Sequence, residues 1–283
     1  MAIHSLMLLL ALAIALGLRS FLPTYQRRWQ ISLFFFLFPP LLLVMTAIAV
    51  ICMGYGGQMF GYHENRLSYV LALAWISFAL FSLIQRYYQA DRARKYLENY
   101  PRAIVEGQPA RIIDLDFPYS ARVGLWDSEL VITRGLLELL DEEHLSSVLA
   151  HESAHSDYRD TFWFFWLGWA RSFSAWLPNT EELWSELVFL RELRADNHAA
   201  RSVDPLLLAE SLLQVARKVN QVSAIEFPAE CCATLADESL NNRLLERIDA
   251  LVEEETESPR FCWQVWVLLS FSLAPFLLLP WHS

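Results

Sequence analysis

The sequence has few charged residues, no excess of basic charge and only four cysteines, and each shortage excludes a class of protein. Only 19% of its 283 residues are charged, whereas 55% are hydrophobic, which disfavours an ordinary soluble domain. Lysine and arginine number 22 against 32 acidic residues, and the net charge of −10 predicts no nucleic-acid partner. The cysteines lack the two-residue spacing of zinc knuckles and redox motifs, so they indicate neither.

The hydrophobic residues gather in four blocks, each long enough to cross about 30 Å of hydrocarbon as a helix. The blocks are residues 2–18, 31–53, 67–84 and 262–280. The first has neither the basic start nor the cleavage site of a signal peptide, so we interpret it as a span. We therefore predict three transmembrane helices within residues 1–86 and a C-terminal one within residues 261–283.

Basic residues predict the orientation of these spans. Arginine and lysine are concentrated after the first and third blocks, whereas the loop between the second and third has only Arg66. Short loops rich in basic residues stay in the cytoplasm. Both termini are then expected outside and residues 87–260 inside, and this interval contains 31 of the 32 acidic residues.

Residues 87–260 have the pattern of one α+β domain. Runs at 110–116, 120–126 and 129–133 are short and apolar and are separated by turn residues, which predicts a small antiparallel sheet. Helical patterns follow, the first with Asp141 as its N-cap. Residues 161–178 are almost long enough to span, but Arg171 in their middle favours a helix at the membrane surface or packed across the domain.

The stretch "LSSVLAHESAHSDYRD" at residues 145–160 carries the clearest chemical signal. His151 and His155 are four residues apart, so a helix presents both imidazoles on one face, close enough to share a metal ion. Glu152 can reach a water on that ion and take its proton. At the end of the helix, an ion-pair network is the favoured interpretation of Asp157, Arg159 and Asp160.

A catalytic zinc site takes three protein ligands and keeps one open position. A third histidine six residues after His155 is excluded, because that position is Thr161. The segment "RELRADNHAA" offers Glu192 instead, with Asp196 one helical turn later. We expect Asp196 to hold the second nitrogen of a ligand imidazole, that of His151.

These motifs carry a family resemblance. "VLAHESAHSDYRD" followed by "LRELRADNHAA" resembles the membrane-bound gluzincin zinc metallopeptidases, and the lead-in "FPYSARVGLWDSELVITRGLLELLDEEHLSSVLAHE" extends the likeness. The arrangement of spans is similar to that of the β-lactam sensor-transducer (antirepressor) peptidases. The "RELRADNHAA" segment is more similar to the heat-shock and CaaX-protein membrane endopeptidases. The choice between these groups stays open.

The resemblance implies a mainly α membrane protein whose cytoplasmic α+β gluzincin domain hydrolyses peptide bonds of protein substrates with one Zn²⁺ per chain. It implies His151, His155 and Glu192 as metal ligands, Glu152 as general base and Asp196 as the residue that orients a histidine. His198 and Arg194 are the candidates for stabilising the oxyanion. The expected substrate-binding edge strand comprises Ser120, Ala121, Arg122, Val123 and Gly124.

Two questions about function stay open at this point. The compact architecture suits a bacterial inner membrane, with the lipid bilayer and a protein or peptide as partners, while the oligomeric state is not indicated. The alternative to an enzyme is a non-catalytic membrane signalling or scaffold protein that retains the peptidase fold. The intact set of five metal-site positions favours the enzyme.

Overall fold

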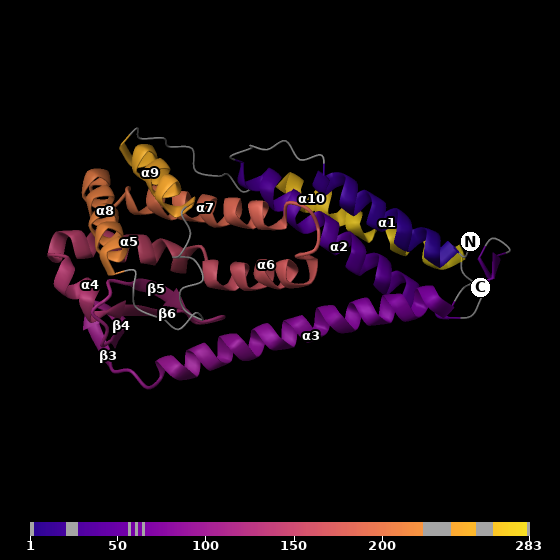
Figure 1. The fold of residues 1–283 in the computed structure, drawn as a ribbon, viewed down its shortest axis with the longest axis horizontal. Coiled ribbons are helices and arrows are strands. Elements are labelled where there is room, and N and C mark those ends of the chain that lie inside the picture. Colours follow the sequence, from indigo (N-terminus) through magenta and orange to yellow (C-terminus); the bar gives the residue numbers. More distant parts are fainter. Residues whose placement is uncertain are drawn as a thin grey trace. The chain divides into compact units, whose positions relative to one another are not determined.

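The computed structural model describes residues 3–20, 28–55, 58–59, 62–63, 66–222, 239–252 and 263–281. Internal contacts divide the chain into two units (Figure 1). The first comprises residues 1–85, 166–190 and 259–283, and the second comprises residues 86–165 and 191–258. Residues 166–190 therefore group with the apolar helices, whereas the sequence interval 87–260 had placed them in the peptidase domain.

Among the described residues, three helices are long and apolar enough to cross a membrane, and the first unit contains two of them and residues 66–85 of the third. They are α1 (Ile3–Ser20), α2 (Trp29–Met53) and α3 (Arg66–Leu97), with a short hairpin of β1 (Gln58–Met59) and β2 (Tyr62–His63) between the last two. Small residues let α1 approach α2 closely, since Ala11 and Ala15 are buried against Leu42 and Leu43. Three of the predicted spans thus correspond to helices of sufficient length.

The fourth predicted span is not one continuous α-helix. It begins at residue 262, outside the described residues, and continues as α10 (Trp263–Ser270) and then the 3₁₀ helix η1 (Phe271–Trp281). Pro275 and Pro280 lie inside η1, and proline has no N–H to donate to an α-helical ladder. The membrane crossing of this segment stays a prediction.

Arg19, at the end of α1, is completely buried and satisfies a carbonyl that a proline has left without its donor. Pro40 cannot donate the helical hydrogen bond to the carbonyl of Phe36, four residues earlier. Arg19 Nη2 donates to that oxygen instead, at 3.1 Å, and Nη1 donates to the carbonyl of Pro178 at 3.4 Å. A buried arginine thus offsets the break that Pro40 introduces in α2.

We expect Arg19→Leu to destabilise the protein, because each buried carbonyl left unpaired costs about 1–3 kcal/mol. Thermal unfolding of the full chain in detergent measures the loss, with the exposed Arg28→Leu as control. Pro40→Ala returns an N–H to α2, so the cost of Arg19→Leu should shrink in that background. An equal cost in both backgrounds would contradict this role of Arg19.

The second unit contains a four-stranded sheet with the order β3–β4–β6–β5. The strands are β3 (Arg102–Val105), β4 (Gln108–Ile113), β5 (Ser120–Val123) and β6 (Glu129–Thr133). Strand β3 was not predicted from the sequence, and it pairs with β4 through the two-residue turn Glu106–Gly107. Both turn residues have positive φ, 48° and 77°, as expected for a turn that matches the twist of a hairpin.

The prediction of a purely antiparallel sheet was wrong, because β4 and β6 are parallel. The chain passes from β4 to the outer position of β5 and returns through an antiparallel hairpin, so that β6 lies between them. Leu130, Val131 and Ile132 in β6 are all completely or almost completely buried. A run of consecutive apolar residues suits a central strand that is covered on both faces.

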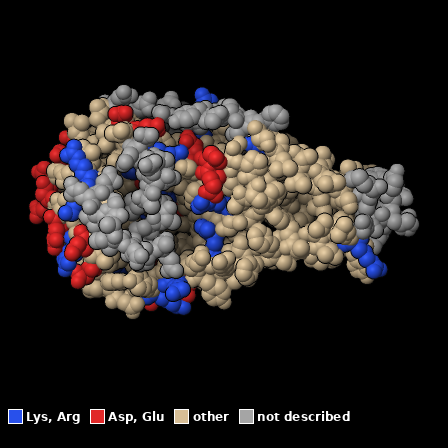
Figure 2. Space-filling model, in the orientation of Figure 1, with Lys and Arg blue, Asp and Glu red and all other residues tan. Residues whose placement is uncertain are grey.

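Helices cover the sheet and build the frame of the second unit. Leu130 and Ile132 pack against α4 (Arg134–Leu139) and α5 (Glu142–Asp157), while Val131 packs against Leu97 of α3. Helices α8 (Pro205–Val222) and α9 (Ser239–Val252) also belong to this unit, whereas α6 (Asp160–Ser174) and α7 (Thr180–Ala199) each have residues in both units. Charged side chains crowd the visible face of this unit and are scarce over α1, α2 and the part of α3 in the first unit (Figure 2).

The apolar segment at 161–178 forms most of α6 and packs within the first unit through its C-terminal half. Trp169 donates its indole N–H to the carbonyl of Ala79 in α3 at 2.8 Å. The Phe173 ring lies edge-on to Trp75, with 6.1 Å between centroids. Arg171 pairs with Glu181 and lies over the Trp184 ring, so the charge in the middle of this segment has partners.

Candidate metal centre

Helix α5 presents two histidines on one face, as the spacing predicted. Its N-cap is Asp141, whose side chain accepts from the backbone N–H of His144 at 2.9 Å. The turns of α5 that precede the histidines are anchored in the core by Leu145, Val148 and Leu149. His151 and His155 are both largely buried, and their Nε2 atoms lie 3.1 Å apart with the rings nearly perpendicular.

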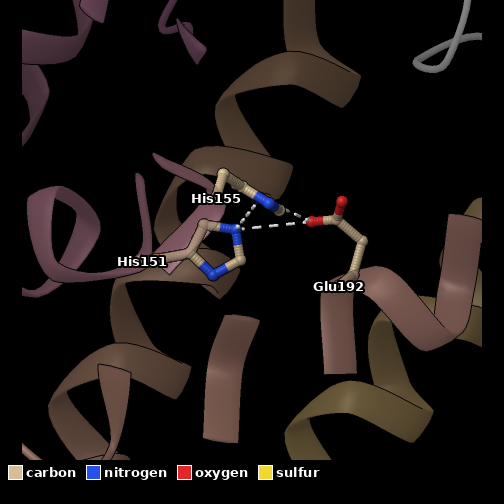
Figure 3. A group of neighbouring side chains, drawn as sticks. All are labelled: His151, His155 and Glu192. Atoms are coloured by element: carbon tan, nitrogen blue, oxygen red, sulfur yellow. Dashed lines mark hydrogen bonds and ion pairs between the residues drawn. The ribbon is translucent and has the colours of Figure 1, made fainter. Parts of the chain in front are cut away.

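Glu192 approaches this pair from α7 (Figure 3). Its Oε2 atom lies 3.3 Å from Nε2 of His151 and 3.7 Å from Nε2 of His155. Its other oxygen, Oε1, accepts from Arg191 Nε at 2.9 Å and from Arg191 Nη2 at 2.6 Å. The carboxylate is thereby turned so that a single oxygen faces the two imidazoles.

The three facing atoms form a triangle with sides of 3.1, 3.3 and 3.7 Å. Ligand atoms bound tetrahedrally to zinc at about 2.0–2.2 Å lie about 3.3–3.6 Å from one another. The triangle therefore has the size of one face of a zinc coordination tetrahedron. Two imidazoles and one carboxylate are also the donor set of a catalytic zinc site that keeps its fourth position open.

Each histidine has a carboxylate on its far nitrogen. His151 Nδ1 lies 2.8 Å from Asp196 Oδ1, the contact expected from the sequence. His155 Nδ1 lies 2.8 Å from Oδ2 of Asp160, which is almost completely buried. Such contacts place the proton on Nδ1 and leave Nε2 as the electron donor that a metal requires. Sequence analysis had interpreted Asp160 as part of a helix-end network, so its contact with His155 was missed.

Three arginines surround these carboxylates. Arg247 of α9 makes a two-pronged contact with Asp196, Nε to Oδ2 at 2.6 Å and Nη2 to Oδ1 at 2.8 Å. Its Nη1 also lies 3.6 Å from Glu192 Oε2. Arg194 donates to Asp160, and Arg191 donates to Glu192. Arg247 could not be predicted from residue spacing, because 51 residues separate it from Asp196.

The electrostatics favour a cation at the centre. Burial alone would lower the pKa of His151, but Asp196 and Glu192 outweigh it and raise that pKa to about 10. Burial would raise the pKa of Glu192, yet Arg191 and the histidines hold it well below its usual value. Arg247 similarly outweighs burial and lowers the pKa of Asp196. Both carboxylates therefore stay ionised at neutral pH, and their negative charge next to the imidazoles suits a metal cation.

Glu152, the expected general base, is 6% exposed and contacts strand β5. Its Oε1 accepts a hydrogen bond from Ser120 Oγ at 2.7 Å, and its backbone carbonyl accepts from Arg122 Nε at 3.2 Å. Among the described residues, β5 pairs only with β6 and so has one open edge. Gly124, included in the expected edge strand, lies just past it and has φ of 136°. A Cβ there would lie 2.3 Å from the Asp127 carbonyl oxygen, so glycine is required.

The two oxyanion candidates are engaged in other contacts. Arg194 donates to Asp160, and its guanidinium lies 4.2 Å from the centre of the Tyr158 ring. His198 is about one-third exposed and lies 3.3 Å from both Tyr158 Oη and Asp157 Oδ2. The contacts of Arg194 favour a role in holding Asp160, and through it His155.

Comparisons with known proteins agree with the resemblance expected from the motifs. Residues 120–177 match the model of peptidase family M48. A curated relative, a "Protease HtpX homolog" of Desulforapulum autotrophicum, is 31% identical over 135 residues, which cover 42% of each chain. The match thus spans about two fifths of the relative's length. No solved structure matches the chain. The predicted similarity to membrane-bound gluzincin metallopeptidases is confirmed.

Proposed function

We propose that this protein is an integral membrane zinc endopeptidase that hydrolyses protein substrates at the cytoplasmic face of a bacterial inner membrane. The triangle formed by His151, His155 and Glu192 carries the proposal, because its sides match the spacing of zinc ligands. The M48 match over residues 120–177, which contain both histidines and Glu152, supports the same reaction class. Three apolar helices support the membrane location.

The residues present fit a zinc ion. Asp196 and Asp160 orient the two imidazoles, and Arg191 fixes the oxygen of Glu192 that faces them. When bound, Zn²⁺ acts as a Lewis acid that lowers the pKa of a coordinated water and polarises the scissile carbonyl. We propose one ion per chain, held by these three ligands.

Glu152 performs the proton transfers in this proposal. It accepts the proton of the attacking water and delivers it to the leaving amine nitrogen, as general base and then general acid. Its burial and its position next to His151 in α5 support that role. No covalent bond between the protein and the substrate is required.

The open edge of β5 is the proposed binding site for the substrate backbone. An extended peptide can add to this edge as a further strand and pair with backbone groups of residues 120–123. Ser120 and Arg122 project to the side of β5 that contacts Glu152. A peptide bound there would pass close to the general base.

The proposed domain arrangement completes this assignment. We propose that residues 2–18, 31–53 and 67–84 and the C-terminal segment cross the membrane, and that residues 87–260 form the cytoplasmic peptidase domain. The concentration of acidic residues in that interval and the basic residues at the C-terminal ends of α1 and α3 support this orientation. No nucleic-acid partner is proposed for so acidic a chain.

Metal removal tests the proposal directly. We expect the full chain, purified in detergent, to contain about one zinc per protein and to cleave members of a panel of membrane and unfolded proteins. Treatment with 1,10-phenanthroline should abolish cleavage, because the ligand set loses its ion, and stoichiometric Zn²⁺ should restore it. Elemental analysis and gel-based cleavage measure both effects.

The same experiment separates the enzyme from its alternative. A non-catalytic scaffold that retains the fold would bind zinc through His151, His155 and Glu192 yet cleave nothing in the panel. Cleavage that persists after complete removal of the metal would contradict the zinc mechanism and point to a contaminating peptidase.

A further inference from the structure

Strand β5 does more than offer an open edge, because its first residue contacts the side chain of the general base. Ser120 Oγ lies 2.7 Å from Glu152 Oε1, and 32 residues separate the two in the sequence. The serine hydroxyl donates this hydrogen bond, and the carboxylate oxygen accepts it. We propose that Ser120 is a positioning residue that holds Glu152 in the orientation needed for proton transfer. This inference rests on the proposed function.

The contact is part of a rigid connection between the sheet and α5. Arg122, two residues after Ser120 and therefore on the same face of β5, donates to the backbone carbonyl of Glu152. Arg122 Nη2 also donates to Gln108 Oε1 at 3.0 Å, and Gln108 Nε2 donates to Ser153 Oγ at 3.0 Å. Strands β4 and β5 are thereby fixed to α5 at Glu152 and at the next residue, Ser153.

This arrangement determines which atoms of Glu152 are available. Ser120 donates to Oε1, and the side chain of Glu152 is almost completely buried, so this hydrogen bond and the surrounding packing together restrain its rotation. The bond therefore selects one rotamer and leaves Oε2 for the water that attacks the substrate. A general base must lie within about 2.6–3.2 Å of the proton it removes, so a small rotation of the carboxylate is costly.

The contact also assigns a register to the substrate. Ser120 belongs to the strand whose edge is proposed to pair with the peptide, and its side chain reaches the general base. The peptide bond that is cleaved should therefore lie opposite Ser120. Residues 121–123 of β5 should then pair with the substrate residues on one side of that bond.

Four variants test this role by steady-state kinetics. Ser120→Ala should lower kcat about ten-fold while KM stays within about two-fold, because the substrate edge is a backbone feature. Ser120→Thr keeps the hydroxyl and should retain near wild-type kcat, whereas its isostere Ser120→Val should behave like Ser120→Ala. Ser202→Ala is the control, since that serine is exposed and donates to the Ala199 carbonyl, outside the contacts that hold Glu152. Unchanged kcat in Ser120→Ala, or an equal loss in Ser120→Thr, would overturn the proposal.

A stability cycle tests the contact without relying on catalysis. Ser120→Ala should lower the unfolding temperature of the wild-type chain but have no effect in a Glu152→Ala background, because its partner is then absent. Equal shifts in both backgrounds would overturn the proposed contact. If the wild-type chain and Glu152→Gln are equally inactive, the peptidase function fails, and the cycle still decides whether Ser120 holds Glu152.

Discussion

Glu152→Gln is expected to lower kcat/KM for protein cleavage by about 10³-fold while the protein keeps its zinc. General acid–base catalysis contributes about 10²–10⁴-fold, and glutamine has no carboxylate to receive a proton. Its side-chain oxygen can still accept from Ser120, so the local geometry should be retained. The loss should therefore appear in kcat with little change in KM.

The control for this experiment is a matched substitution on the same helix. Glu143→Gln changes an exposed glutamate in the first turn of α5 and should leave cleavage near the wild-type rate. Zinc content and unfolding temperature should be the same in all three proteins. A Glu152→Gln protein that contains zinc and cleaves at the wild-type rate would show that another group moves the proton.

The sequence predicted those parts of the site that depend on spacing within one helix. His151 and His155 are four residues apart on α5, and Glu192 and Asp196 are four residues apart on α7. Helical geometry places such pairs on one face without any knowledge of the fold. For this reason the expected approach of Asp196 to His151 agrees with the structure.

Other parts of the site depend on chain reversals that the sequence does not signal. Asp160 reaches His155 because Arg159, between α5 and α6, has a φ of 51° and turns the chain back. Arginine is not a residue that usually marks a left-handed position. Arg247 likewise meets Asp196 only through the packing of α9, in which Ile248 and Leu251 contact Leu208.

The sheet shows the same distinction between local and long-range information. The runs that form β4, β5 and β6 were predicted, since apolar residues and turn residues mark each of them. The order of these strands in the sheet was not predicted. Consecutive strands were expected to pair antiparallel, but the β5–β6 hairpin folds back so that β6, and not β5, lies beside β4. Thr133 at the end of β6 donates twice to the connection that leads into β5. Its hydroxyl donates to the carbonyl of Phe117, and its backbone N–H donates to the carbonyl of Tyr119.

Arg247→Met is expected to destabilise the metal-free protein by about 3–5 kcal/mol, the usual cost of leaving a buried charge without its partner. Arg247 pairs with Asp196 through two hydrogen bonds and lies 3.6 Å from Glu192 Oε2, so its loss leaves two buried carboxylates short of positive charge. Chemical denaturation of the full chain in detergent measures the change. Arg201→Met, at an exposed position, should have almost no effect.

Two further variants separate charge from packing at this position. Asp196→Asn in the Arg247→Met background removes both members of the pair, so the double variant should be more stable than Arg247→Met alone. Arg247→Lys keeps the charge but loses the two-pronged contact, and we expect an intermediate loss. Because zinc supplies positive charge next to Glu192, added Zn²⁺ should recover part of the stability of Arg247→Met. If the double variant were no more stable than the single one, the cost would come from lost packing of α9, and Arg247 would not be the counter-charge of the metal centre.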